Sequence, residues 1–142
     1  MQTIETLAGG LLRMPWTPGP LDGTREAVVV SITDFALDAR DDFEEVLAAG
    51  LQLMAAWPVM HGAVGLWLWA KPAEGRSGSV SVWGRHEDLQ RFVRWPTHVA
   101  IMRQWRERGT IASDLWTAQR FRPAETWSRA EQRLQRPHEA AA

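Results

Sequence analysis

The sequence has no cysteine and no tyrosine, and Lys71 is its single lysine. Without cysteine, disulfides, thiolate metal ligands and a thiol nucleophile are all excluded. Without tyrosine, no phenol can act as a general acid. Any chemistry must therefore come from His, Asp, Glu, Ser, Thr, Arg or this one lysine.

Excess charge and long apolar runs are scarce as well. Sixteen basic residues stand against 17 acidic ones in a chain of 142, a net charge of -1. This balance gives no electrostatic reason to expect nucleic acid or an anionic membrane as a partner. No apolar run approaches the roughly 18 residues of a membrane span, and Glu5 interrupts the apolar stretch that a signal peptide would need. We therefore expect a cytoplasmic protein that binds neither nucleic acid nor membrane.

Sequence motifs for cofactors are also missing. The chain has no glycine-rich phosphate loop, no metal-spaced set of carboxylates and no nucleophile elbow. We expect no metal site and no nucleotide cofactor held by a recognised motif. What the chain has in excess is tryptophan, with nine residues, whose large flat side chains fill a dense core or line an aromatic cavity.

Hydrophobic spacing and turn residues divide the chain into three parts. Residues 1–25 are rich in proline and glycine and predict an irregular arm. Residues 26–122 predict one domain, and residues 123–142 a short helix and a tail. Within the domain, the periodicity predicts the following elements in chain order: a strand at 26–35, a helix at 38–57, a hairpin of strands at 64–71 and 79–84, a helical region at 86–109 and a strand at 111–121.

Two features refine the second helical region. Pro96 disfavours helical geometry at Trp95 and removes a backbone donor, so we expect the helix to break there. Gly109 is expected to end the restarted helix in a left-handed conformation.

The order β-α-β-β-α-β predicts an α+β fold of the ferredoxin-like type, a four-stranded antiparallel sheet with both helices on one face. The strands carry large apolar side chains on both faces, and the two helices cover only one. We therefore expect a homodimer in which a second copy covers the other face.

The segment SVSVWGRHEDLQRFVRWPTHVAIMRQWRERG, followed by a strand containing Trp116, resembles the dimeric α+β barrel superfamily. That superfamily includes antibiotic-biosynthesis-type monooxygenases, polyketide cyclases and haem-degrading monooxygenases. The piece FVRWPTH is similar to the spheroidene-monooxygenase-like branch. In haem-degrading members a tryptophan on this helix precedes a histidine ligand, and here Phe92 and Met102 occupy those positions, with His98 one turn early. Many members carry an asparagine on the first strand, where this chain has Ser31.

His98 is the strongest catalytic candidate from the sequence. It follows the proline break, in the first turn of a helix, on the stripe that continues through Met102. The helix dipole and partial burial favour its neutral imidazole, the form that a general base needs. The alternative is a core histidine bonded to a backbone carbonyl. His61 either borders a pocket mouth or faces solvent.

Asp34 and Asp114 each interrupt an apolar strand, so each must be paired or lie at an edge in water. Asp114 is the candidate partner that would orient His98, with edge exposure as its alternative. We expect a pocket between the sheet and the restarted helix, and the alternative for its tryptophans is packing in the core or at a dimer interface. The candidate substrate-binding residues are Ser31, Trp67, Trp69, Trp83, Trp95, Met102 and Trp116.

Three functions remain open from the sequence. The first is an enzyme that acts on an apolar polyketide-, terpenoid- or aromatic-type metabolite without a cofactor, by monooxygenation or by base-assisted cyclisation or isomerisation. The second is a haem protein with His98 as the axial ligand. The third is a non-catalytic dimer that binds a small ligand.

Overall fold

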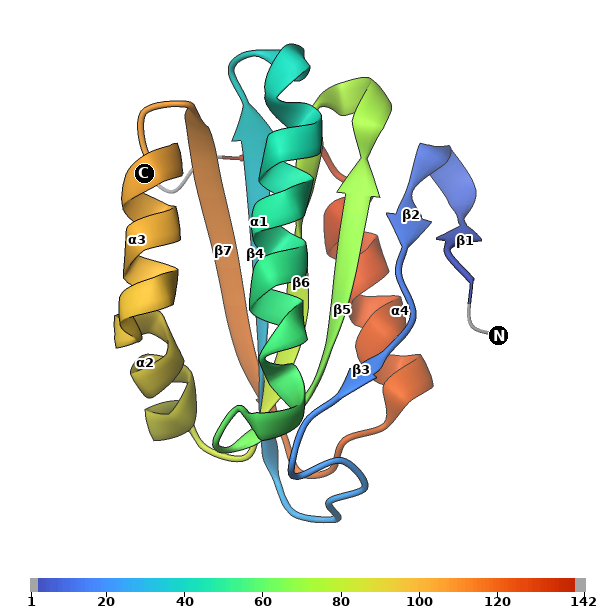
Figure 1. Cartoon of the computed structure of the whole chain (residues 1–142). Coiled ribbons are helices and arrows are strands. Elements are labelled where there is room, and N and C mark those ends of the chain that lie inside the picture. The colour runs from blue at the N-terminus through green and yellow to red at the C-terminus, as the bar shows by residue number, and fades with distance from the viewer. Residues whose placement is uncertain (1–2, 140–142) are drawn as a thin grey trace.

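The structure, a computed structural model, describes residues 3–139. Its principal strands and helices, labelled in Figure 1, are β4 (Val28–Leu37), α1 (Phe43–Ala55), β5 (Ala63–Lys71), β6 (Arg76–Trp83), α2 (His86–Arg94), α3 (Pro96–Trp105), β7 (Gly109–Ala118) and α4 (Pro123–Leu134). The N-terminal part adds the short strands β1 (Glu5–Thr6), β2 (Leu12–Arg13) and β3 (Thr17–Pro18). Within this described part, no helix is long and apolar enough to cross a membrane.

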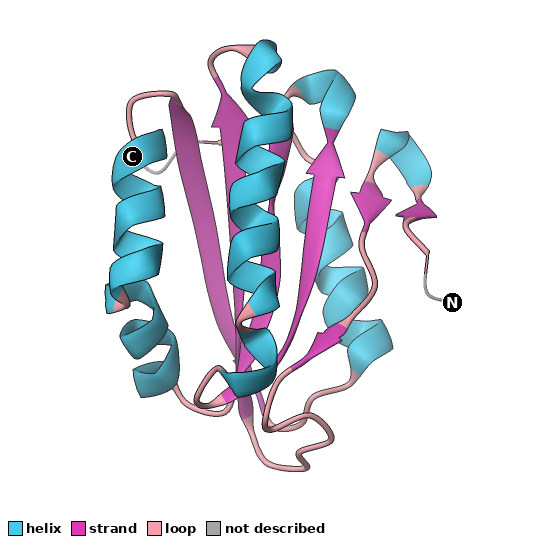
Figure 2. Cartoon of the chain, viewed as in Figure 1, coloured by secondary structure: helices cyan, strands magenta, loops and turns pink. Residues whose placement is uncertain are grey.

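The strands form one antiparallel sheet in the order β1-β2-β5-β6-β4-β7, with β3 also paired to β5. The central four strands, β5-β6-β4-β7, have the order of a ferredoxin-like unit, with the first and third strands of the domain side by side in the middle. Helices α1, α2 and α3 lie on one face, here called the helix side, and α4 lies on the other (Figure 2). The predicted fold class is therefore confirmed.

Alternation along the strands gives the sheet two separate cores. On the helix side, Val29, Leu66, Leu68 and Trp83 pack together with Trp57. The opposite face is formed by Val28, Val30, Ile32, Val64, Trp67, Trp69, Val80 and Val82. Both faces are thus apolar, as the sequence predicted.

Helix α4 covers the face that the sequence analysis left bare. Trp127, Ala130 and Leu134, spaced three and four residues apart on one side of α4, are all buried in that core. The end of the helix is held by two buried cations, because Lys71 Nζ and Arg76 Nη2 donate to the carbonyl of Leu134 at 3.3 and 3.2 Å. The chain itself therefore buries much of the surface on which the expectation of a homodimer depended, and the homodimer stays a prediction.

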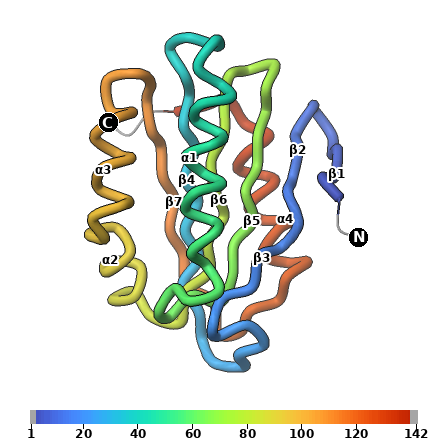
Figure 3. Tube along the Cα trace, in the orientation of Figure 1, coloured from blue at the N-terminus to red at the C-terminus, as the bar shows by residue number. Residues whose placement is uncertain are grey.

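The N-terminal arm is more regular than predicted. Residues expected to be irregular pair with the edge of β5 through β2 and β3, as the trace in Figure 3 shows. Trp16 lies so close to the backbone of Gly65 that a Cβ there would meet its ring at 1.8 Å. The same indole stacks on Phe121 at 5.1 Å. Tertiary contact, which local sequence does not report, thus orders this arm.

The break at Pro96 is confirmed. Trp95 adopts extended angles (φ −60, ψ 129) between α2 and α3. Because of this break, α2 and α3 are separate helices. Residues from the end of α2 and the start of α3 both border the segment 56–61 that precedes β5. Trp95 and Pro96 of this junction line a hollow on the helix side.

Candidate functional site

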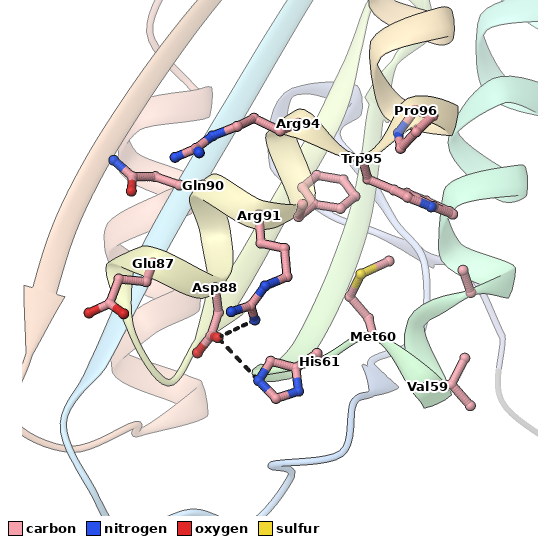
Figure 4. Close-up of a pocket in the computed structure, with 12 residues that line it drawn as sticks. Val59, Met60, His61, Glu87, Asp88, Gln90, Arg91, Arg94, Trp95 and Pro96 are labelled. Atoms are coloured by element: carbon pink, nitrogen blue, oxygen red, sulfur yellow. Dashed lines mark hydrogen bonds and ion pairs between the residues drawn. The ribbon is translucent and has the colours of Figure 1, made fainter.

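A hollow of about 720 Å³ opens on the helix side, where residues 56–61 meet α2 and the first residue of α3 (Figure 4). Residues 57–59 form the 3-10 helix η3 (Trp57–Val59) before β5. The hollow is lined by Ala56, Val59, Met60, His61, Glu87, Asp88, Gln90, Arg91, Phe92, Arg94, Trp95 and Pro96. Its volume lies in the range of ordinary small-molecule sites.

One wall of the hollow is apolar and aromatic. Met60, Phe92 and Trp95 line it, and behind Phe92 lie the rings of Trp57 at 5.2 Å and Trp83 at 5.3 Å. Trp57 and Trp83 are buried, so they hold the Phe92 ring from the core side. A wall built in this way suits a flat apolar ligand, because stacked and edge-on rings bind one another favourably.

The other end of the hollow is polar and centres on Asp88. The Asp88 side chain is 9 % exposed, and its Oδ1 lies 3.6 Å from His61 Nε2 and accepts a 3.1 Å hydrogen bond from Arg91 Nη1. Figure 4 shows the His61 and Arg91 side chains converging on this carboxylate. Asp88 lies in the first turn of α2, near the positive end of the helix dipole.

Gly62 is what allows Asp88 to sit beside His61. It has φ +78, and a Cβ at this position would lie 2.1 Å from Asp88 Cγ. A glycine is therefore required for both conformation and space. The sequence predicts His61 only as a pocket border or a solvent-facing residue, and it gives Asp88 and Arg91 no role in a site. The adjacent Gly62 was the one local signal of close packing.

His98 lies beside this hollow but does not line it. Its ring centroid is 4.5 Å from that of Phe92, and Nδ1 is 3.0 Å from the carbonyl oxygen of Val93. Burial lowers the pKa of His98, while the bond to Val93 acts in the opposite direction. A neutral ring that donates Nδ1–H to this carbonyl keeps a lone pair on Nε2. The contact with the Val93 carbonyl agrees with the alternative of a core histidine, and the lone pair on Nε2 agrees with a general base.

The sheet separates the other predicted site residues into two groups. Ser31 and Trp83 lie on the helix side, where Trp83 Nε1 donates to Ser81 Oγ at 2.9 Å. Trp67 and Trp69 belong to the core under α4. Trp116 and Asp114 share that face, because they pair with Val30 and Ile32 of β4. Met102 is 38 % exposed on α3.

The predicted partnership of Asp114 with His98 is therefore wrong, and the predicted single pocket is divided. Asp114 is on the opposite face of the sheet from α3, because its register with Ile32 turns it toward α4. The Trp67 and Trp69 strand cannot contribute to a helix-side pocket for the same reason. Of the candidate substrate-binding residues, Trp95 alone lines the hollow, and Trp83 supports it through Phe92.

The donors at the hollow do not match those of the haem alternative. That alternative requires His98 as an axial ligand, but the histidine that lines the hollow is His61, whose side chain is 75 % exposed and lies beside Asp88. Across residues 3–139 no group of three or more His, Asp or Glu residues is arranged to hold a metal ion. The residues that line the hollow therefore do not fit a haem ligated by His98.

No protein-family model and no curated protein matches the sequence. Solved structures do match the fold. One is SnoaB, a cofactor-independent oxygenase from Streptomyces nogalater, with a TM-score of 0.53 and 22 % identity over 68 % of this chain and 97 % of that one. Another is LmHde, a heme-degrading enzyme from Listeria monocytogenes, with a TM-score of 0.57 and 12 % identity over 77 % of this chain and 72 % of that one. A protein from Shewanella oneidensis matches with a TM-score of 0.56 and 13 % identity over 67 % and 93 %. The chain thus shares the ferredoxin-like α+β fold with these three proteins.

Proposed function

We propose that this protein is an enzyme that binds an apolar aromatic small molecule in the helix-side hollow and removes a proton from it. The observation that carries the proposal is the make-up of the hollow. An aromatic wall formed by Phe92 and Trp95 faces a histidine, His61, that is paired with a carboxylate. A flat ligand on the wall would place an acidic C–H or O–H group near the imidazole.

Asp88 would act through His61. A carboxylate 3.6 Å from Nε2 stabilises the imidazolium that forms when the base accepts a proton. Arg91 holds the carboxylate in place through its 3.1 Å bond. His98 is the second candidate base, because its ring contacts Phe92 and its lowered pKa keeps it neutral.

Cofactor-independent monooxygenation needs little more than this. Once deprotonated, an electron-rich aromatic can itself reduce dioxygen, so that one oxygen atom enters the product and the other leaves as water. The fold likeness to SnoaB, a cofactor-independent oxygenase, supports this reaction type over cyclisation or isomerisation. Those two reactions would use the same base without consuming oxygen.

Anthrone, a neutral three-ring ketone with an acidic CH2 group, is a suitable probe. We expect saturable quenching of tryptophan fluorescence and consumption of dissolved oxygen above the buffer rate. Trp95→Ala should weaken binding, and His61→Gln should lower turnover about 100-fold or more while leaving binding in place. His86→Gln is the matched control, because His86 is exposed at the start of α2 and does not line the hollow.

The outcomes separate the alternatives. Loss of turnover in His98→Gln with normal turnover in His61→Gln would assign the base to His98. Turnover equal to that of the natural protein in all three histidine variants would contradict base catalysis by either His61 or His98. A Soret band in the purified protein would favour the haem alternative, and binding without oxygen uptake or product would favour a ligand-binding protein.

A further inference from the structure

A second hollow lies on the opposite face of the sheet, between β7 and α4. It has a volume of about 400 Å³, and it is lined by Asp114, Trp116, Arg129, Gln132, Arg133 and Arg136. The four residues from the C-terminal part are spaced three, four and seven residues apart, so they share one side of the helix and its continuation. We call this the arginine groove.

The arginine groove carries an excess of positive charge. Its lining has three arginines and one carboxylate, although the whole chain has a net charge of -1. The Asp114 carboxylate accepts the backbone N–H of Leu115 at 2.9 Å. Within the described residues, neither Arg129 nor Arg136 forms an ion pair. Two guanidinium groups are thus available to a ligand.

Arg133 is only partly neutralised. Its Nη1 lies 3.7 Å from Asp34 Oδ2, but both oxygens of that carboxylate already accept hydrogen bonds from Arg76, at 3.2 and 2.8 Å. Asp34 is therefore shared among Arg76, Arg133 and His138, whose Nδ1 lies 3.1 Å from Asp34 Oδ1, while Arg76 also pairs with Glu74 at 2.8 Å. The Arg133 side chain is 14 % exposed, so its remaining charge is poorly screened by water.

Arg129 packs over the ring of Trp116. The guanidinium carbon of Arg129 lies 4.4 Å from the centroid of the Trp116 ring. A stacked guanidinium keeps its N–H groups free at the edge of the plane, where they can donate to an oxygen anion. The ordering that a flexible arginine would need on binding is thus partly achieved beforehand.

We propose that the arginine groove binds a small organic polyanion through its carboxylate or phosphate groups. Positions 129 and 136 are separated by about 10 Å along the helix direction, with Arg133 between them. A molecule with two or more anionic groups can contact all three arginines, whereas a single small anion reaches one or two. Guanidinium groups suit both acids, because their paired N–H donors match carboxylate and phosphate oxygens.

Titration calorimetry of the full-length protein at constant ionic strength tests the proposal. The probes are citrate for carboxylates, pyrophosphate for phosphates, and acetate and chloride as small monoanions. We expect saturable binding of citrate, pyrophosphate or both, and weaker or no binding of the monoanions. Comparison of the first two identifies which acid the groove prefers.

Charge-removing variants locate the site. Arg129→Gln/Arg136→Gln should weaken binding of the preferred probe by about tenfold or more, because charge-assisted hydrogen bonds are lost. Arg103→Gln/Arg106→Gln removes the same charge from the exposed end of α3 and should leave binding unchanged. Thermal denaturation should show all variants folded, because each of the four substituted side chains is exposed.

Three results would overturn the proposal. One is the absence of saturable binding by either polyanion, and another is an equal loss in both double variants. The third is a combination of two observations: the unmodified protein binds no polyanion, and Arg129→Gln/Arg136→Gln converts a dimer to a monomer on sedimentation. This combination would make the groove a subunit interface. None of these affects the function proposed for the helix-side hollow, which lies across the sheet.

Discussion

Among single residues, the two aspartates on strands lie in opposite environments, one buried and one exposed. Asp34 is fully buried and accepts two hydrogen bonds from Arg76, which is itself 2 % exposed. Asp114, on the same face of the sheet, is exposed at β7. The sequence showed that each must be paired or in water, but strand order decides which. β4 is central, so its carboxylate needs a partner, whereas β7 is at the edge.

Asp34→Asn should lower the free energy of unfolding by about 3 kcal/mol or more, since it leaves a buried guanidinium without its main counter-charge. Glu74, which binds Arg76 Nη1 at 2.8 Å, limits the loss. Asp114→Asn is the matched control and should change the stability by no more than about 0.5 kcal/mol. Urea denaturation measures both, and equal effects would contradict the importance assigned to the buried pair.

His98 gives a pH-dependent prediction. Because burial lowers its pKa in the folded state below the ordinary value of 6.5, the unfolded chain binds more protons around and just below that value. Stability from this residue is therefore present at neutral pH and falls as the pH drops from about 7 through the lowered pKa.

The difference in unfolding free energy between the natural protein and His98→Gln should accordingly become smaller on acidification from pH 7.5 to 5. Chemical denaturation at several pH values measures this difference. A difference that is constant over this range would show that His98 is not desolvated. The variant retains a neutral side chain that can donate to the Val93 carbonyl. The comparison therefore separates protonation of His98 from loss of this hydrogen bond.

At the scale of secondary structure, the sequence predicted the elements but not how they pack. Periodicity located every strand and helix of the ferredoxin-like unit, and Pro96 placed the break between α2 and α3. The left-handed conformation predicted for Gly109 is wrong. It begins β7 without a left-handed conformation, and glycine is needed there because a Cβ would lie 2.4 Å from the carbonyl oxygen of Ala36.

Helix α4 is an integral part of the core rather than a peripheral helix. Leu134 is fully buried against the sheet, and Leu134→Ala should lower the free energy of unfolding by about 2 to 5 kcal/mol. Val59→Ala, at a side chain that is 83 % exposed, should change it by less than about 0.5 kcal/mol. Urea denaturation checks the pair, and a small effect at Leu134 would contradict the covering role of α4.

At the scale of the whole molecule, the sheet divides the chain into two chemically different sides. The helix-side hollow combines aromatic rings with a His61 and Asp88 pair, and the arginine groove across the sheet combines a tryptophan with three guanidinium groups. Sequence periodicity indicated which residues alternate along a strand, but it could not state which face α4 would occupy. That missing fact is why Trp67, Trp69 and Trp116 were assigned to the wrong pocket.

The position of α4 in the chain also affects biosynthesis. A ribosome completes β4, β5, β6 and β7 before it makes residues 123–134, so the apolar face formed by Val30, Trp67, Trp69 and Val80 lacks the cover of α4 while the rest of the domain can already pair. Domains fold as the nascent chain emerges, and a sheet face exposed at that stage invites aggregation. Until α4 has been synthesised, this face is thus the part of the domain most open to aggregation.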